Sequence, residues 1–268
     1  MTRSVGIVVP AYRPDPERLT AYLDALTARL DLSVVRVELD APRSDIYEQL
    51  GPLPDCVEVA TADRRRGKGT AITAGFEALV ADVDVLAFAD ADGSTPSESF
   101  ASIVSTVTDG DADLAVGSRR HPDADVATHQ TLARRRLGDG FAWLARRMLD
   151  ESLYDYQCGA KALTADTWRD VREHLYEPGF AWDIELVAIT NALEHQIVEV
   201  PVRWEDQPGS TVSTVGTTLR FARALVTARH RARLLREDRL HELLATGRSE
   251  PSLLDRLAAG ETEAVEAD

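Results

Sequence analysis

The segment from Val83 to Pro96, VDVLAFADADGSTP, limits the possible folds of this chain more than any other. It opens with an apolar run from Val83 to Ala89 that only Asp84 interrupts, and this pattern is typical of a buried parallel strand. Two carboxylates, Asp90 and Asp92, follow directly. The sequence therefore predicts a central strand that ends in a pair of acids.

This acid pair lies where an open α/β sheet binds its ligands, beyond the carboxyl end of a strand. Carboxylates two residues apart in a turn can face one point, which suits a hard divalent cation that holds phosphate groups. A helix is expected next, with Ser94 or Thr95 as its N-cap and Pro96 at its first position. A polar turn that binds nothing is the alternative interpretation.

The first half of the chain alternates strands and helices. Strands are expected at residues 5–9, 33–39, 57–60, 83–89 and 113–116, and helices after Asp15, at 70–80 and at 96–108. This alternation predicts an α/β fold, with a mostly parallel central sheet between two layers of helices.

The second half is less regular. Helices are expected at 131–149, 182–193 and 216–236, an extended segment at 154–163, and an edge strand at 197–204 because Pro201 interrupts it. We therefore expect a catalytic domain at 1–215, a C-terminal helical appendage at 216–260 and a disordered acidic tail at 261–268.

Composition narrows the class of protein. A net charge of −15 over 268 residues argues against nucleic-acid binding. Many acids with only two lysines, Lys68 and Lys161, are typical of a protein from a halophilic, GC-rich organism. The two cysteines do not form a disulfide framework. With no signal peptide and no run of 18 apolar residues, the chain is expected to be cytoplasmic.

Charged residues follow several of the expected strands, and the carboxyl ends of parallel strands meet at one edge of a sheet. These residues are Asp40, Asp63, Lys68, Asp90, Asp92 and Arg119. Together they suit a nucleotide pocket. The turn after the first strand lacks the G-x-G-x-x-G of dinucleotide-binding folds, and Gly67-Lys68-Gly69 lacks the spacing of a P-loop.

Six motifs occur in a defined order along the chain. They are Pro10-Ala11-Tyr12, Arg66-Gly67-Lys68-Gly69, Asp90-Ala91-Asp92-Gly93, Gly117-Ser118-Arg119, Gln157-Cys158-Gly159-Ala160-Lys161 and Glu199-Val200-Pro201-Val202-Arg203-Trp204. As a set, this order resembles the inverting family 2 glycosyltransferases of GT-A fold over residues 5 to about 215. The branch of polyprenyl- or dolichyl-phosphate sugar synthases is the most similar.

The resemblance implies a role for each matching residue. Donor binding falls to Pro10, Tyr12, Asp40, Asp63, Lys68, Asp90, Ala91, Asp92 and Arg119. Acceptor and phosphate binding falls to Arg135, Arg136, Asp155, Gln157, Lys161, Trp182, Arg203 and Ser210. Asp90 and Asp92 would hold Mg²⁺ or Mn²⁺, and Asp92, Asp183 and Glu185 would be catalytic.

Some of these residues have simpler interpretations. Arg135 and Arg136 fit the solvated face of a helix, Asp183 fits an N-cap, and Glu185 fits a first-turn charge. The sequence also departs from the family pattern at three places. Leu39-Asp40-Ala41-Pro42 stands where Asp-Asp-Gly-Ser is usual, Arg13 replaces an Asn, and Thr211 replaces a Lys.

The implied function is metal-dependent transfer of a hexose, with inversion, from a UDP- or GDP-sugar to a lipid phosphate such as dolichyl phosphate. Two alternatives stay open. One is a glycosyltransferase that extends a lipid-linked glycan at a sugar hydroxyl, with Asp183 or Glu185 as the base. The other is a GT-A-like binding module without activity. The oligomeric state is not predicted.

The segment 216–236 adds a membrane hypothesis. It contains six arginines, and its apolar residues Phe221, Leu225, Ala228, Ala232 and Leu235 form one stripe. A basic amphipathic helix suits an anionic membrane surface, which predicts peripheral association with the inner face of the cell membrane. The alternative is that the stripe packs on the domain and that the arginines meet acids there.

Overall fold

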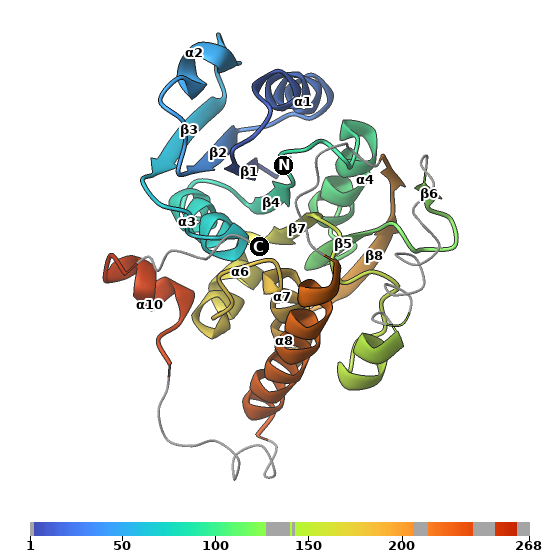
Figure 1. Ribbon diagram of the computed structural model, residues 1–268. Coiled ribbons are helices and arrows are strands. Elements are labelled where there is room, and N and C mark those ends of the chain that lie inside the picture. Colours follow the sequence, from blue (N-terminus) through green and yellow to red (C-terminus); the bar gives the residue numbers. More distant parts are fainter. Residues whose placement is uncertain (1–2, 127–139, 141–142, 206–213, 238–249, 262–268) are drawn as a thin grey trace.

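A seven-stranded sheet forms the centre of the molecule (Figure 1). The computed structural model describes residues 3–126, 140, 143–205, 214–237 and 250–261. The sheet order is β3-β2-β1-β4-β7-β5-β8. Its strands are β1 (Val5–Tyr12), β2 (Val34–Asp40), β3 (Val57–Ala62), β4 (Val85–Ala89), β5 (Leu114–Ser118), β7 (Ala160–Thr164) and β8 (Ile197–Pro201). Only β7 is antiparallel to its neighbours in this sheet, which confirms the mostly parallel α/β prediction.

Helices cover both faces of this sheet. Among the described residues, the helices include α1 (Pro16–Arg29), α2 (Ile46–Leu50), α3 (Lys68–Leu79), α4 (Ser97–Thr108), α6 (Ala165–Val171), α7 (Trp182–Ala192), α8 (Thr214–Leu235) and α10 (Leu253–Ala258), with a 3₁₀ turn, η1, at Arg172–His174. Alternate strand residues point to opposite faces. Val8 and Phe88 therefore join a core with α3, α6 and α7, whereas Ile7 and Ala87 join one with α1 and α4.

The helix after the acid pair begins one residue later than the sequence predicts. Pro96 is the N-cap of α4 rather than its first residue, because its ψ of 150° is extended rather than helical. The polar groups before it have other partners. The Ser94 N–H donates to the Asp92 carboxylate at 2.9 Å, and the Thr95 carbonyl accepts from the Tyr22 hydroxyl at 2.9 Å.

Strand β7 refines the prediction of an extended segment at 154–163. Residues 154–159 form a loop, and the strand itself begins at Ala160 and lies between β4 and β5. The edge strand is confirmed, since β8 with Pro201 closes one side of the sheet. A second, two-stranded sheet pairs β6 (Asp125–Val126) with β9 (Arg203–Trp204) in parallel.

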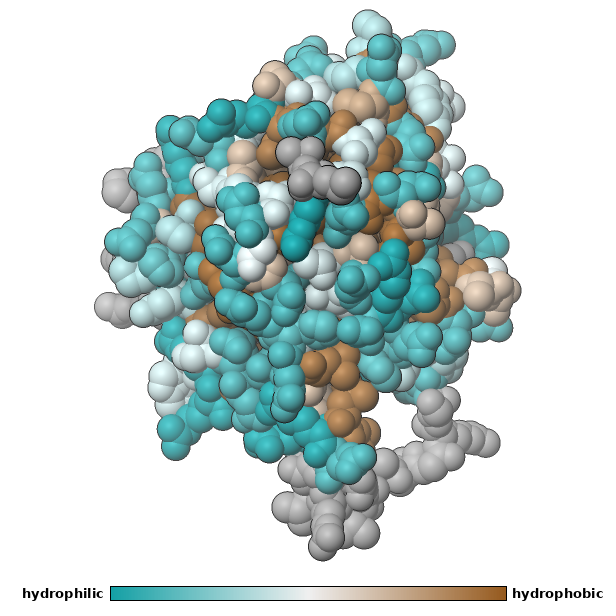
Figure 2. Space-filling model, turned by 180° about the vertical axis from the view of Figure 1, so that it is seen from behind, coloured by the Kyte–Doolittle hydropathy of each residue, from teal (hydrophilic) through white to brown (hydrophobic). Residues whose placement is uncertain are grey.

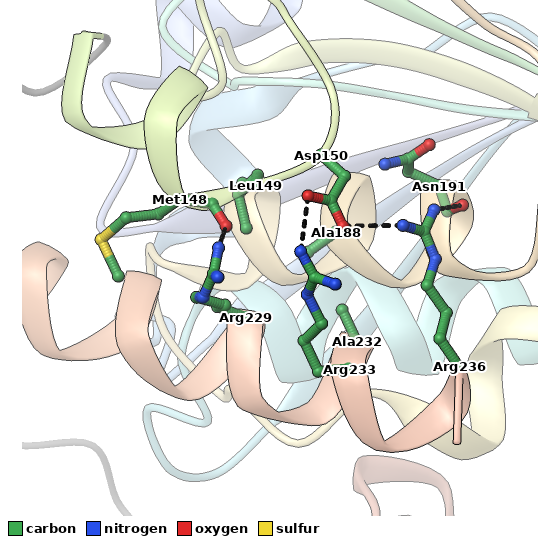
Figure 3. Close-up of a pocket in the computed structure, with 9 residues that line it drawn as sticks. All are labelled: Met148, Leu149, Asp150, Ala188, Asn191, Arg229, Ala232, Arg233 and Arg236. Carbon is green, nitrogen blue, oxygen red and sulfur yellow. Dashed lines mark hydrogen bonds and ion pairs between the residues drawn. The ribbon is translucent and has the colours of Figure 1, made fainter. Parts of the chain in front are cut away.

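Helix α8 packs along α7 (Figure 1). Leu225 and Ala228 are buried in the same core as the residues of α7. Figure 3 shows arginines of α8 reaching the main body, where Arg233 and Arg236 each contact the Asp150 carboxylate, at 2.8 and 2.7 Å. Of the two interpretations of this helix, its described part therefore fits the one in which the stripe packs on the domain.

The rear face of the described part is largely polar. Figure 2 shows the rear face, where hydrophilic residues predominate and hydrophobic residues form small groups between them. Among the described residues, no helix has both the length and the apolar character needed to cross a membrane.

An aromatic cluster anchors α3 and α7 to the sheet. The Phe76 ring lies 5.0 Å from Trp168, 6.3 Å from Trp182 and 6.4 Å from Phe88, measured between centroids. All four side chains are fully buried. The cluster thus joins three helices, α3, α6 and α7, and the central strand into one packed unit.

Replacing Phe76 by Ala is expected to lower the free energy of unfolding by about 3–5 kcal/mol, because the cavity cannot close around rigid rings. Denaturant unfolding followed by circular dichroism measures the change. The control is Trp143→Ala, since that side chain is 59% exposed and its loss should change stability by less than about 0.5 kcal/mol. A loss below about 1 kcal/mol for Phe76→Ala would contradict the tight packing.

Candidate active site

The site is built at the sheet edge where β4 ends and β7 begins. Because these strands are antiparallel, the end of one lies beside the start of the other, and the Asp90 N–H donates to the Gly159 carbonyl at 2.9 Å. A Cβ at position 159 would lie 1.8 Å from an oxygen of the Asp90 carboxylate. Only glycine leaves room for that carboxylate.

Two lysines and two aspartates form a linked cluster beneath this edge. The Lys68 ammonium lies 2.9 Å from Asp90 and 2.9 Å from Asp183. The Lys161 ammonium lies 2.7 Å from the other oxygen of Asp183 and donates to the Cys158 carbonyl at 2.8 Å. Asp183 therefore binds both lysines, and Lys68 joins it to Asp90.

The electrostatics of the cluster follow from burial and from these pairs. Burial alone would raise the pKa of Asp183, but the two ammonium groups outweigh it and hold this pKa below its usual value. Partial removal of water raises the pKa of Asp90; Lys68 opposes this rise, and the carboxylates of Asp92 and Asp183 add to it. The pKa of Lys68 is raised, since its two carboxylate partners outweigh the effect of burial.

Asp90 and Asp92 fit a divalent cation in their chemistry. Both are hard oxygen donors at the sheet edge, Asp90 half-buried and Asp92 exposed. One oxygen of Asp92 accepts the Ser94 N–H, which fixes the carboxylate in the turn. The described residues contain no group of three or more acids, histidines or cysteines able to hold a metal by themselves. The pair therefore suits a cation that takes its remaining ligands from phosphate oxygens and water.

Asp40 shapes the loop that leads into α3. Its carboxylate accepts the N–H groups of Arg66 and Gly67 at 2.7 and 3.1 Å, and the Arg66 guanidinium at 2.8 Å. Glu38 holds the other end of that guanidinium at 2.7 Å. Asp40 is only 3% exposed, and its carboxylate faces the loop. Its predicted part in donor binding stays a prediction.

Arg119, predicted to bind the donor, and Asp155, predicted to bind the acceptor, form one ion pair. The guanidinium binds both carboxylate oxygens, at 2.6 and 3.0 Å, and Asp155 also accepts the Arg119 N–H. Burial would raise the pKa of Asp155, but the guanidinium holds it well below its usual value. Glu199 of β8 accepts the N–H of Asp155 at 2.8 Å and so holds this loop to the sheet.

The remaining predicted donor residues lie along the same edge or outside it. Tyr12 ends β1, is exposed, and has the Arg65 guanidinium 4.4 Å from its ring centroid. Pro10 and Ala91 are half-buried, and Asp63 is exposed beyond β3.

The predicted acceptor residues are scattered. Gln157 lies in the loop before Gly159, and its side-chain nitrogen is buried without a hydrogen-bond partner among the described residues. Arg203 is exposed in β9 and pairs with Glu205 at 3.1 Å. Arg135, Arg136 and Ser210 lie outside the described residues.

Two further predicted site residues, Trp182 and Glu185, are buried and have internal partners. Trp182 is fully buried in the aromatic cluster, so its ring has no surface to offer a sugar. Glu185 is 2% exposed, accepts the N–H groups of Tyr176 and Glu177, and pairs with Arg231 of α8. Helical spacing places Glu185 away from Asp183, and its partners assign it to docking α8 rather than to the cluster.

Sequence reasoning missed the role of Arg66, which holds the loop before Lys68. It stands in a run of three arginines that all look alike in the sequence. The signal was its place directly before Gly67-Lys68-Gly69, because a residue at the end of a strand-to-helix loop is well placed to fix that loop.

Comparisons with known proteins identify the family to which this chain belongs. Residues 7–163 match the family described as "Glycosyl transferase family 2". These residues include Lys68, Asp90, Asp92, Arg119 and Lys161. The chain belongs to glycosyl transferase family 2, and it is a glycosyltransferase by class.

Individual relatives show which members of the family are similar to this chain. Glycosyltransferase AglD of Haloferax volcanii is 28% identical over 223 residues, which are 79% of this chain and 34% of that protein. Dolichyl-phosphate beta-glucosyltransferase of Drosophila melanogaster is 29% identical over 240 residues, 82% of this chain and 73% of that protein. The human enzyme of that name is 25% identical, with 86% and 76% covered. The chain thus spans about a third of the length of AglD.

Solved structures confirm the fold. Glucosyl-3-phosphoglycerate synthase from Mycobacterium tuberculosis, in complex with Mn²⁺, uridine diphosphate and glucosyl-3-phosphoglycerate, superimposes with a TM-score of 0.59. It is 16% identical, and 84% of this chain and 80% of that chain are covered. The GT-A type α/β fold expected from the sequence is thereby confirmed.

The Arg119–Asp155 pair predicts a pH-dependent stability. Asp155→Asn is expected to cost about 3 kcal/mol near neutral pH, because it leaves the guanidinium, 23% exposed, without its charge partner. A carboxyl with a lowered native pKa contributes fully above the unfolded value of about 3.9, and this contribution is lost as pH falls through the native pKa. The difference in the free energy of unfolding between wild type and variant should therefore stay constant from about pH 8 to 5 and shrink below about pH 4.

Urea unfolding at each pH measures that difference. Asp166→Asn is the control, since the Asp166 side chain is 91% exposed in its pair with Arg169. This substitution should change the free energy of unfolding by less than about 1 kcal/mol at every pH. A difference that does not change down to about pH 2 would show that Asp155 stabilises by packing and not by charge.

Proposed function

We propose that this glycosyltransferase moves a hexose from a nucleotide sugar to a lipid phosphate of the polyprenyl or dolichyl type. The observation that carries the proposal is the Asp90–Asp92 pair at the sheet edge with Lys68 beside it, 2.9 Å from Asp90. The names of the relatives support the acceptor, since several are dolichyl-phosphate beta-glucosyltransferases.

The donor half of the site is proposed to contain a divalent cation. Asp90 and Asp92 would hold Mg²⁺ or Mn²⁺, which when bound supplies a Lewis acid that neutralises the departing nucleoside diphosphate. Tyr12 and Arg65 offer an exposed ring and guanidinium on the same edge, suited to the nucleotide. The Mycobacterium enzyme was crystallised with Mn²⁺ and with Mg²⁺ together with uridine diphosphate, which supports this assignment.

The ion pairs of the Asp183 carboxylate favour a phosphate as the acceptor. Both of its carboxylate oxygens are bound by lysine ammonium groups, and its pKa is lowered, so it is a poor proton acceptor. A sugar hydroxyl must lose a proton as it attacks, whereas a phosphate monoester is already ionised near neutral pH. The absence of an available base at Asp183 therefore favours the phosphate.

A lipid acceptor places the reaction at a membrane surface. We infer peripheral association with the inner leaflet, with residues 1–215 as the catalytic domain and 216–260 as an appendage docked through α8. The exposed ring of Trp143 and the exposed Val226 of α8 are candidates for the contact, since aromatic side chains favour the bilayer interface. Sedimentation with anionic lipid vesicles tests it, and equal recovery with and without vesicles would contradict it.

The direct test supplies dolichyl phosphate and Mg²⁺ in high salt, with UDP-glucose or GDP-mannose added separately. Mass spectrometry then looks for a lipid monophosphate hexose. That product is the expected result. Release of nucleoside diphosphate only when a lipid-linked glycan is present would move the acceptor to a sugar hydroxyl, and no turnover with either donor would favour a binding module.

Replacing Asp92 by Asn is expected to lower turnover about 100- to 10,000-fold, because metal stabilisation of the leaving group is worth several kcal/mol. The carboxylate is exposed, so the fold should persist. Initial rates and circular dichroism on the same sample measure both. Asp166 provides a matched Asp→Asn control, since its side chain is 91% exposed on α6, outside the predicted site, and its loss should change turnover far less. Full activity of Asp92→Asn would remove it from the metal site.

A further inference from the structure

Both lysines of this chain belong to one buried set of ion pairs. The chain has 30 basic residues, and every one except Lys68 and Lys161 is an arginine. The Lys161 side chain is 0% exposed, Asp183 is 2% exposed and Lys68 is 8% exposed. Of the four side chains, that of Asp90 is the most exposed, at 41%.

The contacts run in one order from the interior to the surface. Lys161 binds one oxygen of Asp183 at 2.7 Å, and the other oxygen of Asp183 binds Lys68 at 2.9 Å. Lys68 then binds Asp90 at 2.9 Å. The Phe88 ring lies beneath both ammonium groups, with its centroid 5.2 Å from Lys68 and 5.6 Å from Lys161.

Each member of this set needs the next one. A buried ammonium without a carboxylate partner is costly, so Lys161 depends on Asp183. Without Lys161, Asp183 would have Lys68 as its only ion-pair partner, and would draw Lys68 away from Asp90. Without Asp183, Lys68 would have Asp90 alone. The position of the Lys68 ammonium thus depends on attraction from two carboxylates, Asp90 and Asp183. Lys161 controls the share of Asp183, and its fully buried side chain is out of reach of a substrate.

We propose that Lys161 and Asp183 are positioning residues, which fix the Lys68 ammonium and through it the Asp90 carboxylate at the sheet edge. Asp183 is then no base, and Lys161 touches no substrate. Arginine cannot substitute, because a planar fork does not fit where a compact ammonium is fully enclosed. The inference rests on the proposed function only in naming Asp90 as a metal ligand.

Two lysines in 268 residues make the test direct. Lysine labelled with ¹³C at Cε gives two CεH₂ signals, one for each residue, which Lys161→Met and Lys68→Met assign. Lys161→Met is expected to move the Lys68 signal by more than its linewidth, and Asp183→Asn to move both signals. Glu77→Gln is the control, since Glu77 pairs with Arg172 and Trp168 outside this set and should move neither.

An unmoved Lys68 signal in folded Lys161→Met would overturn the proposal. If that variant fails to fold, the wild-type protein decides by itself. Fixed ammonium groups give two distinct Hε shifts at each lysine, whereas a single averaged Hε shift at Lys68, as in free lysine, would contradict a fixed position. None of these measurements uses sugar transfer, so a failure of the proposed function leaves their outcome readable.

The last link, from Lys68 to Asp90, is tested by Mn²⁺ binding followed by electron paramagnetic resonance. Lys161→Met should change the Mn²⁺ affinity in the wild-type background and leave it unchanged in the Lys68→Met background, because the effect passes through Lys68. Equal effects in both backgrounds would mean that Lys161 acts by its charge alone, and would overturn the link. If the wild-type protein binds no Mn²⁺, both the metal site and the Lys68–Asp90 link to it are overturned. The lysine signals then still test whether Lys161 and Asp183 position Lys68.

Discussion

The antiparallel pairing of β7 with β4 is the constraint on which the site depends. A parallel strand in this position would begin at the opposite edge and bring its first residues to the wrong end of the sheet. Because β7 runs the other way, Gly159 meets Asp90 backbone to backbone, and Lys161 pairs in register with Phe88. One strand thus brings the second half of the chain against the acid pair of the first half.

Buried charge sets the second condition. Lys161 and Asp183 have almost no contact with water, and isolated charges in such a place would be strongly unfavourable. Their mutual pairing, together with the Cys158 carbonyl, replaces the lost hydration. The same arrangement at the neighbouring loop pairs Arg119 with Asp155. Rigid pairs of this kind keep charged side chains at fixed positions before any ligand arrives.

Much of the fold could be predicted because buried parallel strands are typically continuous apolar runs, and β1 and β4 have that pattern. Strand β7 was harder, since its five residues include a lysine whose burial depends on a partner 22 positions away. The acid pair and the six motifs could be placed from their order. The ion-pair partners of the acids could not be predicted. Asp183 and Glu185 both lie in the first turn of α7, but in the packed structure Asp183 pairs with Lys161 and Glu185 with Arg231 of α8.

Asp40 illustrates how one remaining acid can serve the site indirectly. The family pattern has two acids after the second strand, and this chain keeps one. Here its carboxylate binds two consecutive N–H groups and a guanidinium, which closes the loop directly before Lys68. A loop closed in this way starts α3 at a fixed point, and Gly69 lets that helix approach Trp182 and the Glu177 carbonyl closely. The remaining acid therefore helps to fix the start of α3, from which Lys68 contacts Asp90 and Asp183.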